Sequence, residues 1–117
     1  MSQQIYTTGS WKPFPGHEAA FLEAWEDFMT WATQLPGAGE AVLARDERDP
    51  ERFVSFAAWE SIDAVHDWKN SPEFKPRMSR VQEHIDKFAP TELDVVICVG
   101  PRSPGTTRDS PGTIVGA

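Results

Sequence analysis

Arg77 and His84 combine a fixed positive charge with a side chain that titrates near neutral pH. Their separation of seven residues puts both on one flank of a predicted helix, beside the apolar residues Met78 and Val81. An arginine and a histidine bordering an aromatic pocket could bind and deprotonate a phenol. The alternative interpretation is a solvated flank of an amphipathic helix.

The other two histidines are weaker candidates for a catalytic base. His17 stands at the start of the first predicted helix, where an exposed polar turn accounts for it. His66 falls nearly opposite Trp68 around a short helix, so we do not expect these two side chains to face one pocket.

Residues that could bind a metal or form a disulfide are few. Cys98 is the single cysteine, so neither an internal disulfide nor a cysteine-based metal cluster can form. It lies in the apolar run "LDVVICVG", where we expect a buried, unreactive thiol. The acidic stretch 46–51 lacks the spacing of an EF-hand and is expected to be a solvated turn, so we predict no metal site.

The overall charge narrows the range of partners. Eighteen acidic residues against 11 basic ones give a formal net charge of −7, which disfavours nucleic acid. No apolar run approaches the roughly 18 residues needed to cross a bilayer. The N-terminal stretch lacks the pattern of a secretion signal, so we expect a cytoplasmic protein with no membrane partner.

The elements that must position these residues follow from the apolar periodicity and the turn signals. We predict helices over residues 17–35 and 62–70, and a third that starts at Ser71-Pro72, carries Phe74, Met78, Val81, Ile85 and Phe88, and ends before Pro90. The predicted strands cover residues 5–12, 40–46, 52–61 and 92–100. The last is a nearly continuous apolar run, as expected of a central strand covered on both faces.

This order of elements predicts an α+β fold of the ferredoxin-like, split βαβ type, with a four-stranded antiparallel sheet and helices on one face. The other sheet face would be bare, and pairing with a second copy would cover it. We expect residues 1–100 to form the domain and residues 101–117 to be a Pro/Gly/Ser-rich tail, in which 113–115 could form a short strand.

Four stretches carry a resemblance to a known family: "PGHEAAFLEAWEDF", "LPGAGEAVLARD", "RFVSFAAWES" and "AVHDWKNSPEFKPRM". Together they resemble the antibiotic biosynthesis monooxygenase family, over about residues 5–99. The resemblance implies a homodimeric α+β barrel with a pocket in each subunit between sheet and helices. It also implies, for the cofactor-free members, oxidation of polycyclic aromatic phenols through an electron-rich enolate that reacts directly with O₂.

Within this resemblance, Trp68 matches the tryptophan that the oxygenase and haem-degrading branches place in their pockets; a core-filling role is the alternative. Gly9 and Met78 stand where the haem-degrading branch has an asparagine and a haem-ligating histidine, which argues against haem degradation. Ala64 and Phe74 stand where the quinone-forming oxygenases have an asparagine and a tyrosine.

The sequence therefore predicts a cofactor-independent monooxygenase that acts on an aromatic or polycyclic small molecule, with a non-catalytic ligand-binding protein as the alternative. His84 is the candidate base and Arg77 the candidate anion stabiliser. The candidate substrate-binding residues are Trp68, Phe74, Trp59 and Met78. For Trp59 and Trp11, a pocket mouth and a dimer interface are both open, and the interface is preferred for Trp11.

Overall fold

A computed structural model describes residues 4–100; the predicted tail 101–117, with its possible strand 113–115, lies outside the described residues. The elements are β1 (Ile5–Pro13), α1 (Glu18–Ala32), β2 (Ala38–Arg45), β3 (Phe53–Trp59), α2 (Ile62–Asn70), α3 (Phe74–Gln82) and β4 (Ile85–Asp94). Neighbouring strands pair antiparallel in the order β2-β3-β1-β4. The predicted ferredoxin-like α+β fold is confirmed.

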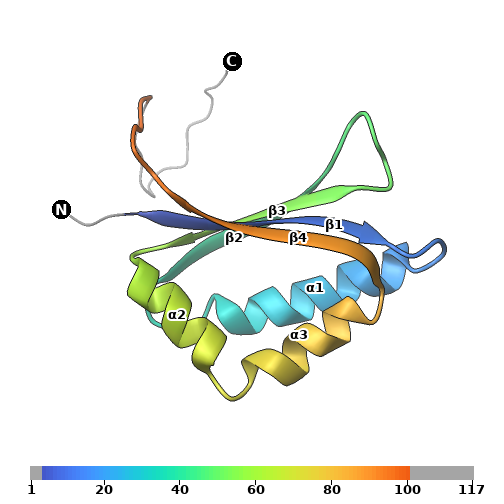
Figure 1. The fold of residues 1–117 in the computed structure, drawn as a ribbon, viewed down its shortest axis with the longest axis horizontal. Helices are drawn as coiled ribbons and strands as arrows, with labels where there is room; N and C mark the ends of the chain where they lie inside the picture. The colour runs from blue at the N-terminus through green and yellow to red at the C-terminus, as the bar shows by residue number, and fades with distance from the viewer. Residues whose placement is uncertain (1–3, 101–117) are drawn as a thin grey trace.

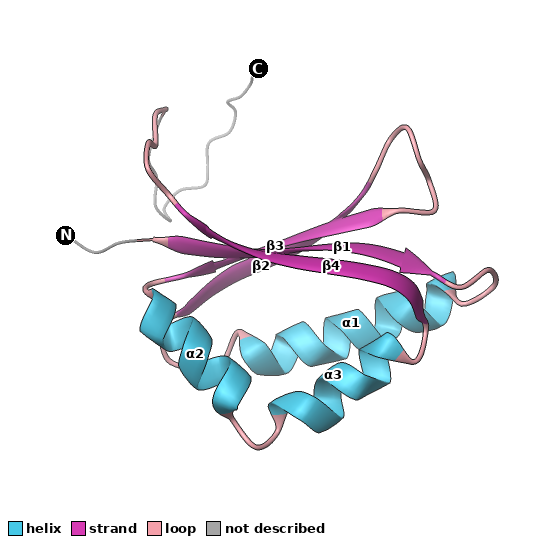
Figure 2. Ribbon diagram, viewed as in Figure 1, coloured by secondary structure: helices cyan, strands magenta, loops and turns pink. Residues whose placement is uncertain are grey.

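All three helices cover the same face of the sheet (Figures 1 and 2). Helix α1 buries one stripe at steps of three and four residues, from Phe21 through Trp25 to Ala32. Alternate residues of β3, from Phe53 to Trp59, point into the same layer. The core therefore lies between sheet and helices. No helix of the described part is long and apolar enough to span a membrane.

The predicted end of the third helix is wrong. Helix α3 ends at Gln82, and Ile85 already begins β4, which pairs with β1 as far as Asp94. Ile85 and Phe88 fit a helical spacing, but they contact the core equally well from a strand, and pairing with β1 decides the outcome. Pro90 is accommodated because β4 is an edge strand.

The predicted central strand at 92–100 is also wrong, because pairing with β1 places β4 earlier in the chain and at the edge of the sheet. Only residues up to Asp94 belong to β4, and the apolar residues that follow are mostly exposed, including Val96, Ile97 and Val99. The expectation of a buried thiol is also wrong, because Cys98 is exposed in this segment.

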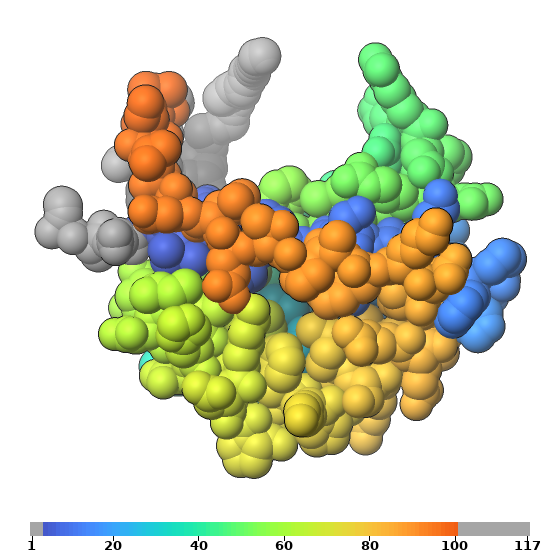
Figure 3. Space-filling view, viewed as in Figure 1, coloured from blue at the N-terminus to red at the C-terminus, as the bar shows by residue number. Residues whose placement is uncertain are grey.

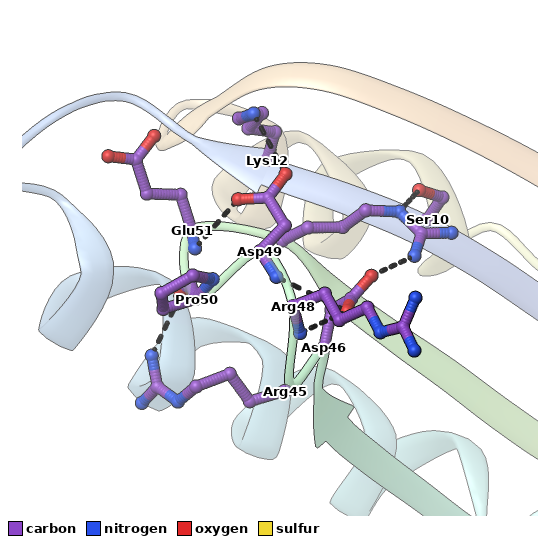
Figure 4. A network of polar contacts seen from close by, with 9 residues as sticks. Ser10, Lys12, Arg45, Asp46, Arg48, Asp49, Pro50 and Glu51 are labelled. Atoms are coloured by element: carbon purple, nitrogen blue, oxygen red, sulfur yellow. Dashed lines mark hydrogen bonds and ion pairs between the residues drawn. The ribbon is translucent and has the colours of Figure 1, made fainter.

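The charged turn between β2 and β3 is ordered by its own side chains (Figure 4). The Asp46 carboxylate accepts hydrogen bonds from the backbone N–H groups of Arg48 and Asp49 and pairs with the Arg52 guanidinium at 2.7 Å. The hydrogen bond from the Arg48 N–H has the largest effect on the Asp46 carboxyl and lowers its pKa. The hydrogen bond from Arg52 has the next largest effect and also lowers this pKa. Arg52 also donates to the Ser10 hydroxyl at 2.9 Å, which ties the turn to β1.

Candidate functional site

A cavity of about 230 Å³ lies between the sheet and the helices. The surface is hollowed between β4 and helices α2 and α3 (Figure 3). Six aromatic residues from both layers line the cavity: Trp11, Trp25, Phe28, Trp68, Phe74 and Phe88. The polar and charged lining is sparse and consists of Thr7, Thr8, Ser55, Lys69, Gln82 and Thr91. Such a site suits a small, flat, largely apolar ligand.

Small residues on β1 and β3 leave room for this cavity. Thr7 pairs with Ala57 and Gly9 with Ser55, so three short side chains and a glycine share the helix-facing side of the sheet. A Cβ added at Gly9 would lie 2.8 Å from Nε1 of Trp11. The close approach of the Trp11 indole therefore requires glycine at this position.

Helix α2 positions Trp68. The Ser61 hydroxyl caps the helix by accepting from the Ala64 backbone N–H at 3.2 Å, and Trp68 then falls on the buried side with Val65. The Trp68 ring stacks on Trp59 with centroids 4.7 Å apart and meets Phe74 edge to face at 5.1 Å. Contacts on two sides fix the plane of the indole.

Trp68 also carries an unsatisfied donor. Trp11 Nε1 donates to the Ser55 hydroxyl at 3.0 Å and Trp59 Nε1 donates to the Thr7 hydroxyl at 3.1 Å. Trp68 Nε1, by contrast, is buried without a hydrogen-bond partner, alone among the side-chain atoms of the described residues. Buried indole N–H groups normally have a partner, so this donor is available to an acceptor atom of a ligand.

Three of the four predicted substrate-binding residues lie together in the cavity wall, and Trp59 does not. Trp68, Phe74 and Met78 line the aromatic cavity. Trp59 is not in the wall; it is only 2% exposed and supports Trp68 from behind.

Arg77 and His84 lie elsewhere. They line a second cavity of about 250 Å³ between α1 and α3, together with the acidic residues Glu23 and Asp27. The Arg77 guanidinium sits over the Trp31 ring, 4.9 Å from its centroid. Phe28 borders both cavities, so within one chain it separates these two residues from the aromatic cavity. Their roles as anion stabiliser and base stay predictions.

The expectation that Trp11 lies at a dimer interface is wrong. Trp11 is 3% exposed, faces the helices and stacks on Phe88 with centroids 4.2 Å apart. The alternation of Thr7, Gly9 and Trp11 along β1 could have revealed this shared face. Phe88 could not be found in this way, because its residue range was assigned to a helix.

An ion pair lies beside the cavity, where α2 approaches β4. The Lys69 ammonium donates to the Glu92 carboxylate, and Lys69 and the neighbouring Thr91 line the cavity. The hydrogen bond from Lys69 is the main cause that lowers the pKa of the Glu92 carboxyl. The pair links the two elements across the hollow.

Comparison with known proteins agrees with this architecture. The family model described as antibiotic biosynthesis monooxygenase matches residues 5–77. SnoaB, a cofactor-independent oxygenase from Streptomyces nogalater, is similar with a TM-score of 0.77 and 16% identity, over 86% of this chain and 100% of SnoaB. A conserved protein from Methanosarcina mazei has a TM-score of 0.72 and 14% identity, over 79% of this chain and 92% of its own. Protein SO0527 from Shewanella oneidensis has a TM-score of 0.73 and 18% identity, over 84% of this chain and 96% of its own. Among curated proteins, none matches the sequence. At these identities the similarity establishes the fold alone.

Proposed function

Because the chain belongs to the antibiotic biosynthesis monooxygenase family, we propose that it is a cofactor-independent monooxygenase that oxidises a small aromatic phenol bound against Trp68. The observation that carries the proposal is the buried, unpaired Nε1 of Trp68, a residue that lines the aromatic cavity. SnoaB, whose fold this chain shares, is a cofactor-independent oxygenase, and this supports the class of reaction.

The chemistry follows from what the cavity offers. A flat ring stacks between aromatic walls, and the Trp68 N–H donates to the phenolic oxygen. The bond strengthens as that oxygen becomes an anion, so it favours the electron-rich enolate that reacts with O₂. In the net reaction, written for the keto tautomer of the phenol, a ring CH₂ becomes a carbonyl, with one oxygen atom of O₂ retained and the other released as water.

The proposed reaction also needs a base that removes the phenolic proton. Lys69 is the only titratable side chain in the described wall of the aromatic cavity. His84 and Arg77 remain our proposed base and anion stabiliser, and these roles require a substrate or proton relay that reaches past Phe28. A fall in turnover for His84→Ala would support them, whereas unchanged turnover would remove them.

The test is oxygen uptake by protein freed of metal and flavin, with anthrone-like and naphthol-like phenols as substrates. Trp68→Phe keeps an aromatic ring and deletes only the donor and part of the indole. We expect it to lower turnover about tenfold or more, which corresponds to a lost hydrogen bond to an anion. Trp31→Phe is the matched control, because it deletes an indole donor to Glu73 outside the cavity and keeps an aromatic ring beneath Arg77, so it should leave turnover unchanged. Equal turnover by Trp68→Phe and the parent would overturn the proposal.

A second candidate function is the binding of an aromatic small molecule without turnover. The scarcity of titratable groups in the cavity wall favours it. Saturable quenching of tryptophan fluorescence by the same phenols, with no oxygen uptake, would establish this function instead.

We also propose that the protein acts as a homodimer in the cytoplasm. The sheet face opposite the helices exposes Val42, Phe56 and Leu93 to 45%, 43% and 47%. A second copy is the occupant that the family fold favours, since an apolar face of this kind is typical of an interface.

A further inference from the structure

The histidines His17 and His84 meet at one end of the molecule, outside the aromatic cavity. Their Nδ1 atoms lie 3.2 Å apart, although 67 residues separate them in the chain. His17 precedes α1 in the loop after β1, and His84 lies in the turn between α3 and β4.

The backbone holds both histidines in place. The Phe14 N–H donates to the His84 carbonyl at 3.0 Å, and the His17 N–H donates to the Phe14 carbonyl at 2.9 Å. The Phe14 ring also packs edge-on against the His17 ring, with centroids 5.7 Å apart. These backbone bonds place the two histidines next to each other at the surface.

The separation of the two nitrogens matches the requirement of a metal ion. Zn²⁺ binds imidazole nitrogen at about 2.0–2.1 Å in tetrahedral geometry, which places two ligand nitrogens about 3.3 Å apart. Without a metal, only one of the two nitrogens can donate to the other, and two protonated rings would repel each other. An ion coordinated by both Nδ1 atoms would use both lone pairs at a nitrogen separation close to the observed 3.2 Å.

We propose that His17 and His84 form a binding site for a divalent transition-metal ion such as Zn²⁺ or Ni²⁺. Residues 4–100 contain no group of three or more histidine, cysteine or acidic side chains placed to hold a metal. The site is thus a two-histidine chelate, and water or an added small ligand completes the coordination. The net charge of −7 favours the approach of a cation.

A bound ion would link the loop after β1 to the start of β4. The first segment follows Trp11 and the second precedes Phe88. The rings of these two residues stack next to Gly9. Because the ion would bind only the folded arrangement, it should raise the thermal midpoint of unfolding, and above Kd the rise should follow the logarithm of the ion concentration.

The test is calorimetric titration of the full chain, first stripped with a chelator, with ZnCl₂ and separately with NiCl₂. We expect one saturable site that weakens on acidification, because protons compete with the metal ion for its ligand nitrogens. His17→Ala and His84→Ala should each weaken binding about tenfold or more. His66→Ala is the matched control, because this exposed histidine on α2 is remote in the sequence from both ligands and should leave binding unchanged.

Two results would overturn the site. One is the absence of saturable binding by the parent. The other is equal affinity of the parent and both single variants, since binding would then take place elsewhere. Imidazole nitrogen NMR gives an independent readout, with signals of His17 and His84 expected to shift on titration while that of His66 stays in place.

Discussion

Gly9 lies on β1 against the rings of Trp11 and Phe88, which line the aromatic cavity. A Cβ at this position would lie 2.8 Å from Trp11 Nε1 and 3.1 Å from Phe88 Cε1. Neither ring can move freely, because Trp11 is buried and bonded to Ser55 and the two rings stack. The side chain that is missing at residue 9 therefore determines how close the two aromatic rings come to the sheet.

We predict that Gly9→Ala destabilises the fold by about 1–3 kcal/mol, as overpacking of a core does. The measurement is urea unfolding followed by tryptophan fluorescence. Gly9→Ala in a Trp11→Phe background supplies the control, because phenylalanine lacks the two Trp11 atoms nearest the new Cβ. Gly9→Ala should lower the free energy of unfolding clearly less in the Trp11→Phe background than in the parent protein. Equal costs in the two backgrounds would show that the Trp11 contact does not limit this position.

The sequence revealed part of this site at the level of single residues. Helical spacing and the family pattern were sufficient to place Trp68, Phe74 and Met78 together. The free donor on Trp68 could not be predicted, since all three indoles of Trp11, Trp59 and Trp68 look alike in the sequence. Only the register that sets Thr7 and Ser55 beside two of them shows that the third has no partner.

At the scale of elements, the boundary between α3 and β4 shows where sequence patterns fail. Ile85 and Phe88 continue the helical stripe of Met78 and Val81, and the apolar run that follows resembles a strand. Pairing of β4 with β1 moves the strand several residues toward the N-terminus. Local periodicity cannot show this, because the competing hydrogen bonds come from the other end of the chain.

The link between α2 and β4 leads to a prediction on pH. The Lys69 hydrogen bond lowers the pKa of the Glu92 carboxyl below its ordinary value of 4.5. A lowered folded-state pKa stabilises the fold above the unfolded-state pKa, and this contribution is lost as the pH falls through the folded-state value. Both side chains are 37% exposed, so solvent screening keeps the contribution below about 0.5 kcal/mol.

We therefore expect Glu92→Gln to lower the free energy of unfolding slightly at pH 7 and to match the parent at an acid pH below the folded-state pKa of this carboxyl. Urea unfolding at the two pH values measures this difference. Lys69→Met should behave in the same way, and the double variant should lose no more than either single one. A deficit of Glu92→Gln that persists in acid would assign the effect to packing instead of charge.

At the scale of the whole molecule, the helices leave one face of the sheet uncovered. The residues of β3 that point away from the helices include Phe56, which pairs with Val42 on β2 and with Thr8 on β1. On the other side of β1, Leu93 of β4 is opposite Tyr6. The turn between β2 and β3 and the segment after β4 project beyond this face (Figure 1). These projections flank an apolar surface that one folded subunit does not bury.

We predict that the parent protein has twice its 13.1 kDa subunit mass in light scattering coupled to size exclusion, and that Phe56→Glu is monomeric. A charge in the middle of a desolvated interface costs several kcal/mol, enough to shift a dimer of ordinary affinity to monomer at micromolar concentration. The subunit itself should tolerate the change, because Phe56 is already 43% exposed. Phe14→Glu is the matched control, since it makes the same substitution at a residue that is 41% exposed but lies in the loop after β1. A monomeric parent, or a Phe56→Glu variant that keeps the doubled mass, would mean that this face does not bind a second copy.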